Sequence, residues 1–142
     1  MNAPLAQRLQ DFYEALPVER ERALERLGDV FAADVHFRDP FRDTHGIEPL
    51  RELFLRMFRQ YRQVEFTGFS RDGDDERFVL TYDMHLRMAV GPRFVTHMAS
   101  VVRGQSGRVV ELVDYYDFPS ALASPLPLLG SLYRKAINLL FL

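Results

Sequence analysis

The spacing of the apolar residues changes once along this chain, and that change constrains the fold more than any other feature. Up to about residue 61 the apolar residues recur at helical spacing, and beyond residue 62 they alternate with polar residues. Helices followed by strands, without the repeated alternation of strand and helix, are typical of an α+β fold. The sequence therefore predicts a curved antiparallel sheet wrapped over helices that pack on one of its faces.

The first half of the chain is predicted to hold three helices. Apolar residues three and four positions apart predict helices over residues 4–16, 18–32 and 47–61, and Pro4 suits the first turn of the first one. Between the second and third helices the chain reads Asp39-Pro40-Phe41. It must run extended or turn there, because a residue that precedes proline is driven out of the helical region.

The second half is predicted to hold four strands joined by tight turns. The alternating segments cover residues 64–68, 78–88, 93–103 and 109–118. Short turns between neighbouring strands predict an antiparallel meander. We expect residues 1–124 to form one domain and residues 125–142 to form an apolar helical extension of it.

The extension is rich in leucine, and so much apolar surface must be buried somewhere. Pro127, Gly130, Arg134 and Lys135 interrupt it, so it does not reach the length of continuous apolar sequence that crosses a bilayer. A helix there would close the mouth of the domain or contact a partner subunit. Attachment to a membrane surface is the third possibility, and it would call for more flanking cations than these two.

Charge and cysteine content exclude several classes of function. Eighteen basic and twenty acidic residues give a formal charge of −2, so the electrostatic attraction that drives nucleic-acid binding is missing for the whole chain. The absence of cysteine excludes disulfides, thiolate metal sites and a cysteine nucleophile. The first ten residues contain no apolar core of a secretory signal, so we expect a cytoplasmic protein.

Asp39 is the first candidate for chemistry, because it lies between Phe37 and Phe41. Apolar surroundings raise the pKa of a carboxyl group by penalising its charged form, which prepares such a group to act as a base or an acid near neutral pH. The alternative is that Asp39 only braces the turn at Pro40, as many Asp-Pro pairs do. The sequence by itself leaves both interpretations open.

The segment 35–41, followed by Gly46, together with the late segment 113–117 resembles the nuclear-transport-factor-two-like superfamily. That superfamily has a cystatin-like cone fold and includes ketosteroid isomerases, SnoaL-type polyketide cyclases, scytalone dehydratase and limonene epoxide hydrolase. The resemblance covers about residues 5–118. In the isomerase branch the Asp of the Asp-Pro-Phe segment shuttles a proton, so the resemblance implies that role for Asp39.

Departures from the isomerase pattern argue against steroid isomerase activity. When the turn at Gly107 is laid on the family's turn, Ala99 stands where an isomerase carries a second, protonated Asp. Tyr13 or its neighbour Phe12 is the nearest match to the isomerase Tyr. The same alignment points His97 and Asp114 into the cone, where they resemble the second acid and base of the cyclase branch.

The predicted site therefore has Asp39, His97 and Asp114 as catalytic residues. The side chains expected to contact the substrate are Tyr13, Phe37, Phe54, Tyr82, Met84 and Tyr116. The expected ligand is a small hydrophobic molecule, no cofactor is expected, and the protein is expected to form a homodimer. One hypothesis is an acid–base isomerase, cyclase or hydrolase. The other is a non-catalytic binding or accessory module, in which the inward polar residues only satisfy one another's hydrogen bonds.

No metal site is predicted. His36, Asp39, Asp43 and His45 lie close together in the sequence, but no three of them fall at an established ligand spacing. His36 alternates with Phe37, so it should face away from the pocket if Phe37 packs inward.

Overall fold

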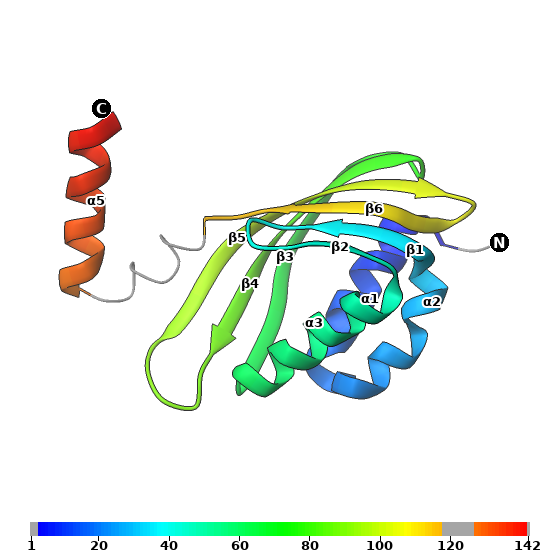
Figure 1. The fold of residues 1–142 in the computed structure, drawn as a ribbon, viewed down its shortest axis with the longest axis horizontal. Coiled ribbons are helices and arrows are strands. Elements are labelled where there is room, and N and C mark those ends of the chain that lie inside the picture. The colour runs from blue at the N-terminus through cyan, green and yellow to red at the C-terminus, as the bar shows by residue number, and fades with distance from the viewer. Residues whose placement is uncertain (1–2, 118–126, 142) are drawn as a thin grey trace.

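A computed structural model describes residues 3–117 and 127–141 (Figure 1). In chain order the elements are α1 (Leu5–Glu19), the 3₁₀ helix η1 (Arg20–Arg26), α2 (Leu27–Val30), β1 (Phe31–Arg38), β2 (Asp43–His45), α3 (Ile47–Gln60), β3 (Gln63–Gly73), β4 (Arg77–Arg87), β5 (Arg93–Gln105), β6 (Arg108–Tyr115) and α5 (Pro127–Phe141). Helices packed on one face of a curved sheet confirm the predicted α+β cone.

The six strands form one sheet in the order β2-β1-β6-β5-β4-β3. Strands β3 to β6 are the predicted antiparallel meander. Strands β1 and β2 were not predicted. β1 pairs in parallel with β6, and β2 pairs antiparallel with β1. The sheet is therefore mixed, and it curves around α1 and α3 (Figure 1).

The helix predicted over residues 18–32 is the largest error in the local prediction. Helix α1 continues through Pro17 to Glu19, the chain then turns through η1, and α2 has only four residues. Strand β1 already starts at Phe31, which is buried and pairs with Val109 of β6. Pairing with a strand almost eighty residues away overrides the local helical pattern, because packing outweighs the small differences in intrinsic propensity.

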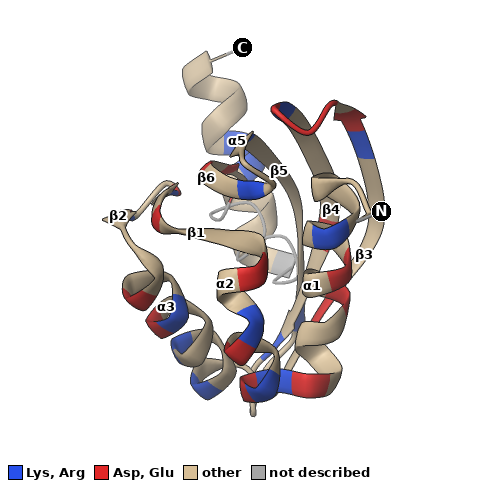
Figure 2. Cartoon of the chain, turned by 90° about the vertical axis from the view of Figure 1, so that its right-hand side faces the viewer, with Lys and Arg blue, Asp and Glu red and all other residues tan. Residues whose placement is uncertain are grey.

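The core fills the space between the helices and the concave face of the sheet. The apolar stripe of α1 is buried along its whole length, as its spacing predicted, through Leu5, Leu9, Phe12 and Leu16. The ring of Phe12 meets those of Phe31 and Phe54 edge to face, with centroids 5.7 and 5.6 Å apart. Acidic and basic residues are interspersed on the helix surfaces visible in Figure 2.

Helix α5 stands apart from the cone in Figure 1. Its polar residues Ser131, Arg134, Lys135 and Asn138 form one narrow stripe at helical spacing. Six large apolar side chains of this helix are exposed: Leu128, Leu129, Leu132, Leu139, Leu140 and Phe141. No helix of the described residues is long and apolar enough to cross a membrane. The role of the extension stays a prediction.

Candidate functional site

A cavity of about 230 Å³ opens between the concave face of the sheet and helices α1 and α3. Its wall is mainly aromatic and aliphatic. The six side chains predicted to contact a substrate all line it: Tyr13, Phe37, Phe54, Tyr82, Met84 and Tyr116. Two carboxylates, those of Asp39 and Asp114, lie in the same wall. An apolar hollow with a few converging polar groups is the usual form of a small-molecule site.

Asp114 ends a buried chain of hydroxyl groups. The Ser100 hydroxyl donates a hydrogen bond to Oδ1 of Asp114 at 2.5 Å, and the Tyr82 hydroxyl lies 3.1 Å from the Ser100 oxygen. The Tyr13 ring packs beside the Tyr82 ring, with centroids 5.2 Å apart. Ser100 is fully buried. Since Ser100 gives its proton to Asp114, Tyr82 donates to Ser100, and the chain runs in one direction toward the carboxylate.

Burial raises the pKa of Asp114 to about 7. The hydrogen bond from Ser100 opposes the rise, and the nearby charge of Asp39 adds to it. Both protonation states of Asp114 are therefore populated near neutral pH, as acid–base exchange requires. Burial also raises the pKa values of Tyr13 and Tyr82, so their hydroxyls keep their protons.

Asp39 lies in the turn between β1 and β2, and its side chain is only 4% exposed. Its Oδ1 accepts the backbone N–H of Phe41 at 2.8 Å, and its Oδ2 pairs with Arg42 at 2.8 Å. The first bond is the short side-chain-to-backbone link of an Asx turn. Asp39 thus braces the turn and faces the cavity at once, so the two interpretations of this residue do not exclude each other. Its proposed role as a base stays a prediction.

Arg42 is a pocket residue that sequence reasoning missed. It lines the cavity, and its pairing with Asp39 places a cation beside the two carboxylates. The sequence signal that could have identified Arg42 is its position three residues after Asp39, on the other side of the turn. Arg42 also lowers the pKa of Tyr116, but burial and the charge of Asp39 outweigh it and raise that pKa to about 12. The Tyr116 hydroxyl is therefore a donor in the pocket wall.

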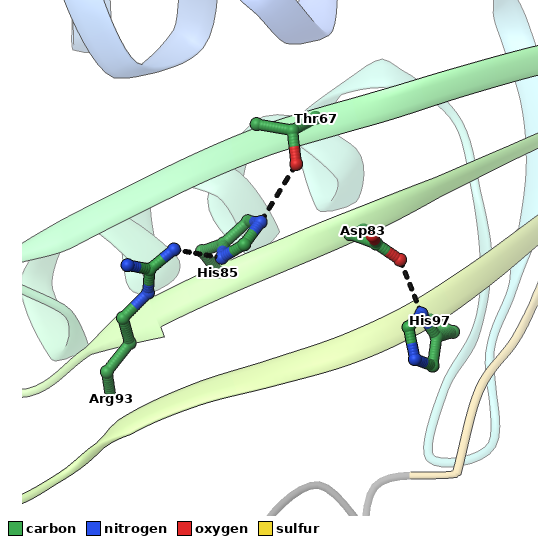
Figure 3. A network of polar contacts seen from close by, with 5 residues as sticks. All are labelled: Thr67, Asp83, His85, Arg93 and His97. Atoms are coloured by element: carbon green, nitrogen blue, oxygen red, sulfur yellow. Dashed lines mark hydrogen bonds and ion pairs between the residues drawn. The ribbon is translucent and has the colours of Figure 1, made fainter.

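The prediction that His97 points into the cone is wrong. Its side chain is 88% exposed on the outer face of the sheet and pairs with Asp83. Figure 3 shows this pair beside a second outer contact, in which His85 meets Thr67 and Arg93. Ala99 and Val101 share the outward orientation of His97, whereas the buried residues of this strand include Met98, Ser100 and Val102.

A β-bulge in the β5–β6 hairpin explains the error. Next to the turn, Gln105 pairs with Arg108, and an unbroken register would bring Ala99 opposite Asp114. The register instead shifts between Arg103 and Gly104, so that Ser100 pairs with Asp114. One extra residue on β6 moves every β5 side chain beyond it to the other face. Ser100 therefore takes the inward position that the alignment gave to Ala99.

Side chains able to hold a metal ion gather outside the cavity. The donor atoms of His36, Asp43 and His45 lie within 4.8 Å of one another on β1 and β2. His36 pairs in register with Glu111, whose neighbour Leu112 is buried, so the cluster lies on the outer face of the sheet.

Solved structures share this fold. A hypothetical protein of ketosteroid isomerase-like fold from Catenulispora acidiphila, in complex with trimethylamine, is 21% identical with a TM-score of 0.70, over 81% of this chain and 88% of that one. A putative polyketide cyclase from Pseudomonas putida is 15% identical with a TM-score of 0.69, over 82% and 94% of the two chains. An LEH-like epoxide hydrolase from M. tuberculosis is 18% identical with a TM-score of 0.69, over 92% of this chain and 96% of that one.

These identities show a common fold and nothing narrower. No curated protein is similar enough in sequence to match the chain. The sequence profile of the SnoaL-like domain matches residues 9–112, which is most of the chain and runs from within α1 to within β6, ending just before Asp114. The chain therefore belongs to the SnoaL-like family.

Proposed function

We propose that this protein is a cofactor-independent acid–base enzyme that moves a proton on a small hydrophobic molecule. The observation that carries the proposal is Asp114, a buried carboxyl group with a pKa of about 7 in the wall of an apolar cavity. Carbonyl compounds, epoxides and polyketide-like molecules are the substrate classes that such a group can serve.

For a carbonyl substrate the carboxylate of Asp114 takes a proton from the carbon next to the carbonyl group. The electron pair left behind moves onto the carbonyl oxygen, which becomes an enolate. Arg42 and the Tyr116 hydroxyl lie in the same wall and supply a charge and a donor to that oxygen. Protonated Asp114 then returns the proton to another carbon, which completes an isomerisation, or to an oxygen.

Asp39 is proposed to hold Arg42 in place and to serve as a second carboxylate of the site. Its charge raises the pKa of Asp114 and so tunes the base. His97 has no part in this proposal, because it lies on the other face of the sheet.

The exchange of substrate protons for solvent deuterons tests this function without a known product. We expect the protein to speed the exchange of the α-protons of small cyclic ketones and β-keto esters in deuterium oxide, followed by proton NMR. Asp114→Asn should lower the rate at least about 100-fold, the ordinary contribution of a positioned base. Asp34→Asn, at an exposed position on β1, is the matched control and should leave the rate unchanged.

A binding module without catalysis is the second candidate, and one observation favours it. Asp39 and Asp114 already have partners within the protein, as expected if the polar groups only satisfy one another. The two candidate functions predict different pKa values for Asp114 in the protein without a ligand. If carbon-13 NMR places the pKa of Asp114 near 4 and no exchange is accelerated, the enzyme proposal fails and the module remains.

The expected homodimer stays a prediction. Exposed apolar residues on the outer face of the sheet, Val79, Val95, Val101 and Tyr115, are the surface that such a dimer would cover. The molecular mass in solution, measured by light scattering, decides whether it forms.

A further inference from the structure

A cluster of ligand side chains lies on the outer face of the β1–β2 hairpin, separate from the cavity. It comprises His36, Asp43 and His45, and it is the one group of at least three potential metal ligands in the part of the chain that the structure describes. None of the three lines the cavity. The proposed acid–base chemistry does not use them.

The hairpin register brings the two histidines together. His36 and His45 are direct partners across the antiparallel pair, and their rings stack with centroids 4.1 Å apart and an interplanar angle of 11°. Asp43 precedes His45 by two residues, so its side chain is on the same face of the strand. Its Oδ1 lies 2.6 Å from Nε2 of His36. Three potential metal ligands from two paired strands therefore lie together on one face of the hairpin.

Glu111 supports His36 from the neighbouring strand. It is the register partner of His36 on β6, and its Oε2 lies 3.7 Å from Nδ1 of His36. The two ring nitrogens of His36 therefore face different carboxylates. A carboxylate behind the non-ligating nitrogen is the common way in which proteins orient a histidine that binds a metal.

We propose that His36, Asp43 and His45 form a binding site for a divalent first-row transition-metal ion such as Zn²⁺. Two imidazole nitrogens and one carboxylate oxygen suit Zn²⁺ or Cu²⁺ better than Mg²⁺ or Ca²⁺, which prefer oxygen ligands alone. The remaining coordination positions are left to water.

The present spread of the donor atoms is close to what an ion requires. Ligand atoms about 2.1 Å from a tetrahedral ion lie about 3.4 Å from one another. The widest separation here is within 4.8 Å, and both Asp43 and His45 are exposed. Arg38 is the cation that interacts with Asp43 and would oppose the ion, whereas Glu111 compensates for it on the other side of His36.

An ion at this position would fasten β1 to β2 at the base of the turn that carries Asp39 and Arg42. That turn continues the hairpin ladder through the bonds from Asp39 N to Arg42 O, at 3.0 Å, and from Arg42 N to Asp39 O, at 3.4 Å. Metal binding would therefore hold these two pocket residues in place from the opposite face of the sheet, whatever reaction the pocket catalyses.

Zinc titration tests the site. The chain has four histidines and no cysteine, so few other side chains compete for the ion if the protein carries no affinity tag. We expect isothermal titration with zinc chloride to show one Zn²⁺ per chain and to show at least tenfold weaker binding for His45→Gln. The control is the double variant His85→Gln/His97→Gln, which removes the other two histidines and should bind like the wild type. Because His45 is exposed, its replacement should leave the circular dichroism spectrum unchanged.

A long-range nitrogen-15 NMR spectrum of the imidazoles gives a second measurement. Zn²⁺ should shift the ring nitrogens of His36 and His45 and leave those of His85 and His97 unchanged. The proposal is overturned if the wild type shows no saturable binding below millimolar Zn²⁺, if His45→Gln binds as tightly as the wild type, or if the double variant loses the ion. None of these outcomes decides the acid–base function, which is tested separately by the proton-exchange assay with Asp114→Asn.

Discussion

Replacing Asp114 by Asn should make the protein more stable at high pH and should leave its stability at low pH nearly unchanged. The ordinary pKa of this carboxyl is 3.8, and burial raises it to about 7 in the folded protein. A folded state whose carboxyl has a raised pKa binds the proton more tightly than the unfolded state does. The contribution of Asp114 to the free energy of unfolding is therefore present in full below about pH 4 and is lost as the pH rises toward 7.

The size of the effect follows from the two pKa values. They differ by about three, from 7 and 3.8, and each pKa unit corresponds to about 1.4 kcal/mol, so the total loss is about 4 kcal/mol. About 3 kcal/mol of that loss falls between pH 5 and pH 8.5. Asn is neutral at every pH and keeps an oxygen that accepts the hydrogen bond from Ser100, so the variant escapes the loss.

Urea denaturation of wild type and Asp114→Asn at several pH values from 5 to 8.5 measures this difference directly. The free energy of unfolding of the variant should exceed that of the wild type by a margin that widens by about 3 kcal/mol over this range. Asp34→Asn, at an exposed position, should run parallel to the wild type. Parallel curves for wild type and Asp114→Asn would refute the claim that burial raises the pKa of Asp114.

Three further changes test the site and the fold. Ser100→Ala removes the hydrogen bond that lowers the pKa of Asp114, so that pKa should rise further in a carbon-13 NMR titration, and urea denaturation should show a loss of about 1–3 kcal/mol from the partners left unsatisfied. Arg42→Gln removes a charge that lowers the pKa of Tyr116, so the NMR titration of that ring should move to higher pH, whereas Arg59→Gln on the exposed side of α3 should not move it. Gly104→Ala would place a methyl group 2.2 Å from the carbonyl oxygen of Asp75 and should lower the midpoint of thermal unfolding sharply, whereas Gly28→Ala meets nothing within 4 Å and should not.

The sequence patterns that predicted correctly belong to elements that bury one apolar face against a single neighbouring layer of the structure. Helix α3 follows its sequence because Leu50, Phe54 and Phe58 lie at helical spacing and all pack inward. The alternation along β4 likewise places Leu80 and Tyr82 in the core. In both elements the apolar face is set within the element, so a single sequence is enough to find it.

The features that sequence reasoning missed depend on pairing between segments. β1 is a strand because β6 accepts it, and the cross-strand pair of His36 and His45 depends on a hairpin register that sequence spacing does not contain. The bulge that turns Ser100 inward and His97 outward is one residue long and leaves no clear signal in the apolar pattern. A family alignment without structure therefore identified Asp114 as an inward residue and mistook its partner.

The parallel pairing of β1 with β6 also fixes when the cavity can exist during synthesis. Asp39 follows β1 and Asp114 lies near the end of β6, so the two carboxylates belong to segments that are synthesised early and late. While the ribosome still holds the last strand, the early helices and β1 have no closed sheet to cover, and their apolar surface stays exposed. Contacts between such distant segments form slowly, because a long loop must close first. A nascent chain should therefore depend on chaperones until β6 emerges, and truncation before that strand should yield an insoluble product.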